Sequence, residues 1–507
     1  MPILDTTEFN PGTAVLAVQG PERIEVTSIT QDSRRCGPAA CFTAISGLHS
    51  DGHRFIPDCI AAGASLIVHE QELDPAILNQ ATGTTFLRVT DSRRAFSALA
   101  AWLYDTPESP LQVIGITGTD GKSTTVSLLH QLLQACGCRS GFLSTVAMHD
   151  GLQESKNSLR QSTPEADEIH QRLARMRDNH CRYAVVEATS HGLSPKTARL
   201  ADVSFTAGVF TNITHEHLEF HGTFEQYRHD KAELFRRATQ ASVLNADDPN
   251  SHWIAQESGA PVRWYSLNPA DQSAIQLDMW AEQIEATPAG SNFLLCTPEA
   301  RLPAHTSLIG EINVANILAA SLAAHSTAGI PLQQIAAAIA GLQGPRGRMM
   351  RIDHGQPFSL FVDYAHTPGS FGKLLPMLKN LAAQRMIVVF GSAGNRDTAK
   401  RPMQGEIADR FADIIVLTDE DPREEDSMAI LEDIADGITA KTRGESLFLI
   451  PDRRTAIEHA CRLAGPGDLV VTLGKGHEGN IQYARESIEW DEPEVASRIL
   501  SGLGYFS

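Results

Sequence analysis

The sequence predicts an α/β protein with several domains built mainly on parallel sheets, and three observations support this. The 507 residues exceed what one hydrophobic core organises, and ordinary domain sizes suggest about three units. Short apolar runs alternate with helical patterns through most of the chain, which is typical of strand–helix–strand units. Glycine-rich and polar turns follow several of these runs, as binding loops do at the carboxyl ends of parallel strands.

The composition indicates a globular protein and excludes some functions. Hydrophobic residues make up 42% and charged residues 20% of the chain. The net charge of -19 argues against a nucleic-acid partner, because phosphate backbones bind to an excess of Lys and Arg. The N-terminal segment lacks a basic region, no apolar run is long enough for a membrane span, and the 8 cysteines are scattered. We therefore expect a soluble, cytoplasmic protein with reduced thiols, and we expect a monomer.

Residues 1–108 form the first predicted domain. It contains strand candidates at 23–30, 65–70 and 85–90 and a helical pattern over 91–105. The segment TPESP that follows has two prolines and no periodicity, so it reads as a linker.

The second predicted domain spans 109–344 and the third spans 345–507. Each alternates apolar runs with helical patterns, so each predicts a mostly parallel sheet with crossover helices. The strand candidates are 112–116, 183–189, 207–214 and 241–246 in the second domain, and 358–365, 385–392, 413–420 and 468–476 in the third.

The segment LQVIGITGTDGKSTT, residues 111–125, has the chemistry of a triphosphate site. Gly118 and Gly121 let backbone N–H groups approach an anion, Lys122 adds a point charge, and the Ser123 hydroxyl can bind Mg²⁺. Ile116 stands where the strict P-loop pattern has glycine, so a plain glycine turn is the alternative reading. The strand before the loop and the helix after it favour the nucleotide site.

Polar residues that follow the next two strand candidates suggest a metal site. Glu187 and His217 would emerge beside Lys122 if their strands flank the phosphate-loop strand, and they could hold Mg²⁺. His217 and His221 also have the i, i+4 spacing of zinc ligands, but the H-E-x-x-H pattern is absent. Lys231 lies in a helical pattern shortly afterwards, and by residue pattern alone it reads as a solvated surface lysine.

Four turns in the last domain pair glycine or proline with charged side chains. They are DYAHTP, GSAGNRDTAKRP, TDEDPR and GKGHE, at 363–368, 391–402, 418–423 and 474–478. A single turn of this kind is often structural, but four together favour a ligand-binding edge of the sheet.

These motifs, taken in order, resemble the Mur ligases, and most closely the E-type enzymes, the UDP-N-acetylmuramoyl-tripeptide synthetases. The resemblance covers residues 32–491 and rests on the combination GTDGKSTT, EATSHGL, TNIT-x-x-HL-x-x-HG, YR-x-x-KAELF, NADD, G-x-x-NV-x-N, GRM, DYAHTP, G-x-x-G-x-RD-x-x-KRP, DPR and GKGHE.

The resemblance implies three domains: one for the UDP end of the substrate, a central P-loop-type ATPase, and a Rossmann-like domain for the amino acid. It also implies ATP as co-substrate, Mg²⁺, and ligation of a diamino acid to UDP-MurNAc-L-Ala-D-Glu through an acyl phosphate.

Carried over position by position, the resemblance implies the site residues. Lys122, Glu187, His217 and Lys231 would be catalytic, with Lys231 carbamylated and Ser123, Glu187, His217 and Lys231 around the metals. ATP would contact Gly118, Thr119, Asp120, Gly121, Lys122, Ser123, Thr124, Asn313, Arg348 and Asp363. The UDP-linked substrate would contact Ser33, Ser162, Thr163, Ser190 and Arg199. The amino acid would contact Arg396, Glu420, Asp421, Arg423, Gly474 and Glu478.

Two departures from the family pattern concern the loops. Asp120 and Ser123 stand where the family commonly has Asn and Thr. The amino-acid loop reads Glu420-Asp421-Pro422-Arg423 in place of Asp-Asn-Pro-Arg. Arg423 favours the distal carboxylate of meso-diaminopimelate, whereas Asp421 favours the bare ammonium of lysine or ornithine. We lean towards diaminopimelate and keep lysine and ornithine as alternatives.

Two other functions stay open on the sequence alone. One is a different ligase of the same superfamily, such as a folylpolyglutamate synthetase, and the other is an inactive nucleotide-binding scaffold. The N-terminal DSR and DGH segments favour the E type over other ligases, and the intact Lys122, Glu187, His217 and Lys231 argue against a scaffold.

Overall fold

The computed structural model describes residues 2–47, 50–157, 163–214, 218–272 and 275–506. Contacts divide the chain into two compact units, each discontinuous in sequence. Unit 1 contains residues 1–281, 295–302 and 315–338, and unit 2 contains 282–294, 303–314 and 339–507. Among the described residues, no helix combines the length and apolarity needed to cross a bilayer. The boundaries expected near residues 108 and 344 stay predictions.

The N-terminal part of unit 1 is a five-stranded sheet with the order β2-β7-β6-β5-β4. Strands β4 to β7 are parallel, and β2 runs antiparallel at the edge. The expected strand at 23–30 divides in two, because its first half pairs separately with β1 (Ile3–Asp5). The bounds are β2 Val15–Gln19, β3 Arg23–Glu25, β4 Ser28–Thr30, β5 Ala40–Thr43, β6 Leu66–His69 and β7 Thr85–Val89.

Helix α3 (Ser92–Leu103) covers this sheet and also joins it to the rest of unit 1. Asp91 caps the helix by accepting a hydrogen bond from the Arg94 backbone N–H. The Arg94 guanidinium donates from Nη2 to Asp202 Oδ1 over 2.9 Å, and Thr106 bonds the buried His170 at 2.6 Å. The short helices nearby are α1 (Ile56–Ala61) and α2 (Pro75–Gln80).

A large sheet centred on β8 (Gln112–Thr117) confirms the parallel topology expected for the middle of the chain. Its order is β11-β10-β9-β12-β8-β13-β14-β15-β16-β17-β18. β8 lies between β12 (Tyr183–Glu187) and β13 (Phe205–Phe210), parallel to both. Glu187 pairs with Ile116, and Phe210 pairs with Thr117. The carboxyl ends of three strands therefore meet directly beside the phosphate loop.

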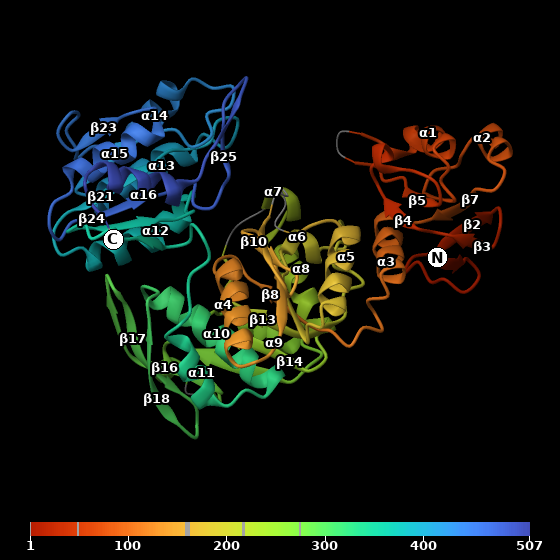
Figure 1. The fold of residues 1–507 in the computed structure, drawn as a ribbon, viewed down its shortest axis with the longest axis horizontal. Coiled ribbons are helices and arrows are strands. Elements are labelled where there is room, and N and C mark those ends of the chain that lie inside the picture. Colours follow the sequence, from red (N-terminus) through yellow and green to blue (C-terminus); the bar gives the residue numbers. More distant parts are fainter. Residues whose placement is uncertain (1, 48–49, 158–162, 215–217, 273–274, 507) are drawn as a thin grey trace. The chain divides into compact units, whose positions relative to one another are not determined.

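Helices cover both faces of this sheet. In Figure 1, α4 (Lys122–Ala135) and α10 (Glu311–Ala328) lie on one side of β8, and α5 (Ala166–Asp178) and α8 (Phe224–Arg237) lie on the other. Gly115 explains how α8 comes so close, since a Cβ there would lie 2.5 Å from Leu234 Cδ1. Ile169, Leu173, Leu234 and Phe235 belong to the same buried cluster.

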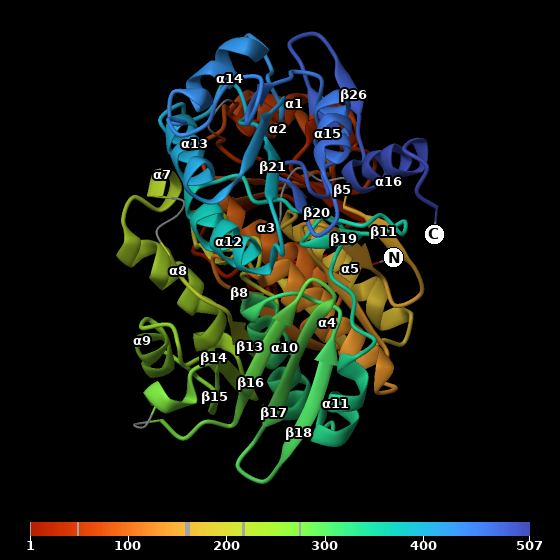
Figure 2. The ribbon, with the colours of Figure 1, turned by 90° about the vertical axis from the view of Figure 1, so that its left-hand side faces the viewer.

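Of the remaining strands of this sheet, only β14 matches a strand candidate of the sequence, and the other seven were not predicted. β16, β17 and β18 lie side by side in Figure 2, at the end of the sheet away from β11. The bounds are β9 Ser140–Leu143, β10 Ala147–His149, β11 Glu154–Lys156, β14 Ala241–Asn245, β15 Val262–Ser266, β16 Met279–Thr287, β17 Gly290–Cys296 and β18 Arg301–Thr306. The short helices are α6 Ser190–Leu193, α7 Leu218–His221, α9 Ser251–Gln256 and α11 Leu332–Ile339.

Unit 2 contains a six-stranded sheet with the order β19-β20-β24-β21-β22-β23, in which only β19 is antiparallel. All four strands expected in this region are present. The strand bounds are β19 Met350–Ile352, β20 Ser359–Val362, β21 Met386–Phe390, β22 Ile414–Leu417, β23 Leu447–Leu449 and β24 Leu469–Thr472, with a hairpin of β25 Asn480–Gln482 and β26 Ser487–Glu489. The helices are α12 Pro368–Leu381, α13 Lys400–Phe411, α14 Ser427–Ala435, α15 Arg453–Leu463 and α16 Glu492–Gly502.

Candidate active site

The phosphate loop joins β8 to α4 and requires both of its glycines. Gly118 has a φ of 155°, and a Cβ there would lie 1.9 Å from Thr211 Oγ1. Gly121 has a φ of 82°, and a Cβ there would lie only 2.4 Å from Asn316 Oδ1. Side chains at either position would be excluded by protein atoms as well as by backbone conformation.

The end of β13 holds the loop in place. Asn212 Oδ1 accepts from the Asp120 backbone N–H over 3.0 Å, and Thr211 Oγ1 donates to the Asp120 carbonyl over 2.6 Å. Lys122 folds back and donates from Nζ to the Thr119 carbonyl over 2.7 Å. Thr124 follows in the first turn of α4. The loop is therefore braced by its own backbone and by the neighbouring strand.

Ser123 and Glu187 come together behind this loop. Ser123 Oγ donates to Glu187 Oε2 over 2.9 Å, and both residues are buried. Glu187 also accepts from the Thr145 backbone N–H and hydroxyl, over 2.8 and 3.0 Å. A hydroxyl and a carboxylate beside a phosphate loop are the hard oxygen donors that suit Mg²⁺, whose other ligands come from phosphate and water. The donor set therefore fits the expected metal.

His217 is the histidine that was expected to act as a metal ligand. His217 lies outside the described residues, as do His215 and Ser162. Within the described ranges, no group of three or more His, Cys, Asp or Glu side chains is arranged to hold a metal ion. His221, the other histidine of the zinc alternative, bonds Asp230 and Ser190 instead.

Lys231 is buried in α8 against the phosphate loop, and only 1% of it is exposed. Its Nζ donates to the Gly118 carbonyl over 2.6 Å and lies 4.6 Å from the Tyr227 ring centroid. Tyr227 Oη in turn bonds Thr119 Oγ1 at 3.0 Å. The surface position suggested by residue pattern alone is therefore wrong, and the position implied by the family motif lies beside the loop.

Three of the residues expected to contact the UDP-linked substrate follow β12 or lie close to its end in unit 1. Thr163 Oγ1 donates to the Glu187 carbonyl over 3.2 Å. Arg199 donates to the Thr163 carbonyl over 3.1 Å and pairs with Glu165 at 2.7 Å. Ser190 begins α6 just after β12. Ser33 lies in the N-terminal part of unit 1, in a turn capped by Asp32.

Three of the residues expected to contact ATP belong to unit 2. Asp363, just after β20, accepts from the backbone N–H groups of Met349 and Ala365, over 2.7 and 2.8 Å. Burial raises the pKa of the Asp363 carboxyl, and the nearby Arg348 opposes that rise. Arg348 lies over the Tyr364 ring at 4.4 Å, and Asn313 Nδ2 donates to the Ile309 carbonyl over 2.9 Å.

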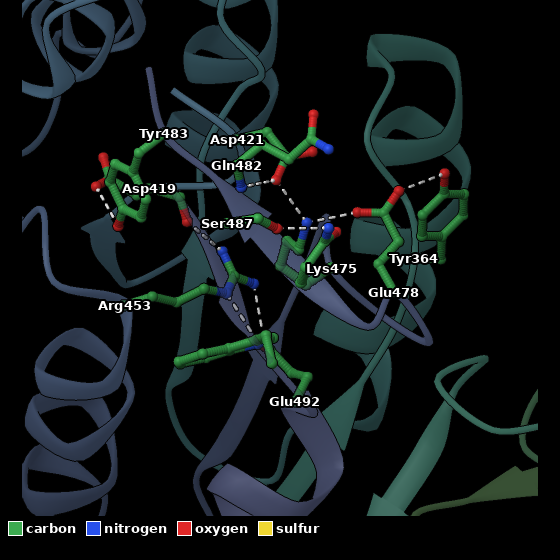
Figure 3. A network of polar contacts seen from close by, with 12 residues as sticks. Tyr364, Asp419, Asp421, Arg453, Lys475, Glu478, Gln482, Tyr483, Ser487 and Glu492 are labelled. Carbon is green, nitrogen blue, oxygen red and sulfur yellow. Dashed lines mark hydrogen bonds and ion pairs between the residues drawn. The ribbon is translucent and has the colours of Figure 1, made fainter. Parts of the chain in front are cut away.

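The loops expected to bind the amino acid meet around one buried lysine. Figure 3 shows Lys475 between two carboxylates, and its Nζ lies 2.8 Å from Asp421 Oδ1 and 2.6 Å from Glu478 Oε2. Asp421 also accepts from the Gln482 backbone N–H, and Glu478 accepts from Tyr364 Oη. The Asp421 charge is therefore balanced inside the protein, which weakens the argument that it selects a bare ammonium.

Glu420 and Arg423 lie on either side of Asp421 in the sequence of the same loop. Glu420 Oε2 and Arg423 Nε are buried without a hydrogen-bond partner among the described residues. Burial raises the pKa of Glu420 to about 7. Gly474 has a φ of 101°, which favours glycine, and a Cβ there would lie 2.8 Å from Glu420 Oε2. Arg396 lies exposed on the loop after β21. A buried acceptor and a buried donor in the same loop suit a ligand that carries both charges.

Comparison with known proteins identifies the family. The Mur ligase family catalytic domain matches residues 25–104, the Mur ligase middle domain matches 116–324, and the Mur ligase glutamate ligase domain matches 347–476. A UDP-N-acetylmuramyl-tripeptide synthetase from Roseiflexus sp. (strain RS-1) is 44% identical over 96% of both chains. The chain belongs to the Mur ligase family.

Two further similarities agree with this assignment. A UDP-N-acetylmuramoyl-L-alanyl-D-glutamate–2,6-diaminopimelate ligase from Geobacillus kaustophilus is 36% identical, covering 95% of this Mur ligase and 96% of the relative. A solved structure of a ligase of that name superposes with a TM-score of 0.67 and 28% identity, over 94% of this chain and 95% of the other. The expected fold is thereby confirmed.

A buried ion pair missed by sequence reasoning supports the amino-acid loops of this Mur ligase. Arg453 and Glu492 have fully buried side chains, and Arg453 Nη2 lies 2.6 Å from Glu492 Oε1. The same guanidinium donates to the Asp419 carbonyl over 2.9 Å (Figure 3) and to the Leu473 carbonyl over 2.7 Å. Arg453 thus ties the loop after β22 to the loop after β24.

We predict that Arg453→Met lowers the free energy of unfolding of this Mur ligase by about 3–5 kcal/mol, because it leaves Glu492 buried without its cation. The double variant Arg453→Met/Glu492→Leu should recover part of that loss. Urea unfolding followed by tryptophan fluorescence measures both. The matched control is Arg443→Met, whose pair with Glu432 is exposed, and it should unfold near the wild-type midpoint. Equal losses in Arg453→Met and the control would contradict the prediction.

Proposed function

We propose that this Mur ligase joins a diamino acid to UDP-MurNAc-L-Ala-D-Glu with cleavage of ATP to ADP and phosphate. It is an ATP-dependent carboxylate–amine ligase of peptidoglycan precursor synthesis, as the names of its relatives indicate. The observation that carries the proposal is the Ser123–Glu187 contact, 2.9 Å long, beside Lys122 on a glycine loop. This is the arrangement that a nucleoside triphosphate with a divalent cation requires.

In the first step, an oxygen of the substrate's terminal carboxylate attacks the γ-phosphorus of ATP, the bond to the β-phosphate oxygen breaks, and ADP leaves. Catalysis of such a step is mostly positioning and charge neutralisation. Lys122 would leave the Thr119 carbonyl to contact the β- and γ-phosphates, while Gly118, Thr119, Asp120, Gly121 and Thr124 surround them. Ser123 and Glu187 would hold Mg²⁺, which neutralises phosphate charge when bound. Asn313, Arg348 and Asp363 are also proposed to contact the nucleotide.

In the second step, the amine of the diamino acid attacks the carbonyl carbon of the acyl phosphate. The nitrogen loses a proton, the carbon–oxygen bond to phosphate breaks, and an amide forms. The UDP-linked dipeptide substrate is proposed to contact Ser33, Ser162, Thr163, Ser190 and Arg199. The position of Thr163 on the Glu187 carbonyl supports a substrate site next to the metal donors.

Lys231 is proposed to act as a carbamate. Its neutral amine would add CO₂ and lose a proton, which turns a buried cation into an anion. The support is its burial beside Gly118 and Tyr227, because a buried ammonium is costly and an anion near the phosphate loop could help to hold a second cation with His217.

For the amino acid, we propose meso-diaminopimelate, with lysine and ornithine as the alternatives. The distal end of diaminopimelate carries a carboxylate for Arg423 and an ammonium for Glu420. Arg423 Nε and Glu420 Oε2 are buried and otherwise lack partners among the described residues. Asp421, Gly474, Glu478 and Arg396 would complete this site. The Asp421–Lys475 pair supports the choice, since it leaves Asp421 less able to bind an ammonium.

The proposed ligase is tested by incubating the protein with UDP-MurNAc-L-Ala-D-Glu, ATP, Mg²⁺ and each of the three diamino acids in parallel. We expect phosphate release and a tripeptide product, fastest with meso-diaminopimelate. Lysine or ornithine as the fastest substrate would overturn the amino-acid proposal alone. A protein that forms no tripeptide with any of the three would overturn the proposed function.

The carbamate is tested with Lys231→Ala, which should lower kcat by at least about 100-fold because the proposed anion is lost. Short-chain carboxylic acids added to this variant should restore part of the rate by supplying the missing carboxylate. Lys196→Ala is the control, because Lys196 is a more exposed lysine that contacts the Phe220 carbonyl. A Lys231→Ala enzyme with wild-type kcat would exclude the carbamate.

A further inference from the structure

Ser190, His221 and Asp230 form a buried chain of hydrogen bonds in unit 1. His221 Nδ1 lies 2.7 Å from Asp230 Oδ2, and His221 Nε2 lies 3.1 Å from Ser190 Oγ. The side chains of His221 and Asp230 are 0% and 2% exposed. The three residues come from three separate helices, α6, α7 and α8, so the chain exists only in the folded protein.

The donors and acceptors in these hydrogen bonds follow from the carboxylate of Asp230. Asp230 Oδ1 accepts a hydrogen bond from Gln226 Nε2 over 2.8 Å, so both carboxylate oxygens are used. An ionised carboxylate only accepts hydrogen bonds, so the Nδ1 atom of His221 must carry a proton and donate it to Asp230. The ring is thereby fixed in orientation, and its Nε2 atom faces the Ser190 hydroxyl.

We propose that His221 and Asp230 are positioning residues that orient the Ser190 hydroxyl towards the UDP-linked substrate. This inference rests on the proposed function, in which Ser190 contacts that substrate. A serine hydroxyl has one proton and two lone pairs, and it rotates freely unless a neighbour fixes it. The hydrogen bond to His221 fixes the rotation of the Ser190 hydroxyl. Its remaining hydrogen-bonding positions are then already oriented for a ligand, and binding costs no further loss of rotational freedom.

The location of the chain links it to the substrate side of the site. Ser190 begins α6 after β12, and the Cβ of a side chain at the next glycine, Gly192, would lie 2.5 Å from Thr163 Cγ2. Thr163 in turn contacts Glu187 and Arg199. Asp230 acts on this group from α8, whereas its neighbour Lys231 reaches the phosphate loop. Loss of Asp230 should therefore affect the substrate more than the nucleotide.

The test is a double-mutant cycle between Asp230 and Ser190, with dissociation constants measured by calorimetry. Asp230→Ala should weaken binding of UDP-MurNAc-L-Ala-D-Glu by about tenfold, whereas binding of Mg·ATP should change less than about twofold. In a Ser190→Ala background, Asp230→Ala should have no further effect, because it acts through the serine. Asp230→Asn, which preserves shape, should fold even if the alanine variant does not and should weaken binding in the same direction.

The control variant is Thr106→Val, which removes a 2.6 Å hydrogen bond to the buried His170 elsewhere in unit 1. It should lower stability without changing the dissociation constant. Nitrogen NMR of the wild type adds a readout that needs no substrate: the His221 Nδ1 atom should be protonated, and its proton signal should shift in Asp230→Asn. Effects of Asp230→Ala and Ser190→Ala that add fully, or an unchanged dissociation constant, would overturn the inference. A wild-type protein that binds no UDP-linked dipeptide would overturn the proposed function instead.

Discussion

The contact between Ser123 and Glu187 is the interaction on which the site in unit 1 depends. It exists because β8 and β12 are neighbours in a parallel sheet and end at the same edge, with Glu187 paired to Ile116. The glycine loop can then turn directly above the carboxylate, and α4 begins at Lys122. A shift of β12 by one residue would move Glu187 to the other face of the sheet and separate the two donors.

The same strand ends determine what lies around this contact. The loop after β13 braces the phosphate loop through Thr211 and Asn212. Ser190 begins α6 just after β12, and Thr163, which precedes α5 in the chain, donates to the Glu187 carbonyl. Helix α8 adds Lys231 on the loop side and Asp230 on the serine side, one residue apart. One helix therefore serves two parts of the site, because consecutive helical residues point in directions about 100° apart.

The sequence predicted the strands and loops that carry local signals, and it was less informative where partners are distant in the chain. β8 and α4 were predictable because an apolar run, two glycines and a helical pattern follow each other directly. β2 was missed because all five of its residues are exposed, so it shows no alternation. The pairs Lys475–Asp421 and Arg453–Glu492 were missed because their members are 54 and 39 residues apart. Lys231 looked like a surface lysine, and only the family motif indicated a buried position.

The central claim is that Ser123 and Glu187 hold the cation of Mg·ATP while Lys122 contacts its phosphates. A crystal structure with Mg²⁺ and a non-hydrolysable ATP analogue tests it most directly. The account predicts a metal ion about 2.0–2.1 Å from Ser123 Oγ and from a Glu187 carboxylate oxygen, and Lys122 Nζ turned from the Thr119 carbonyl to the phosphates. A metal ion bound without either side chain, or a triphosphate located away from the Gly118–Lys122 loop, would contradict it.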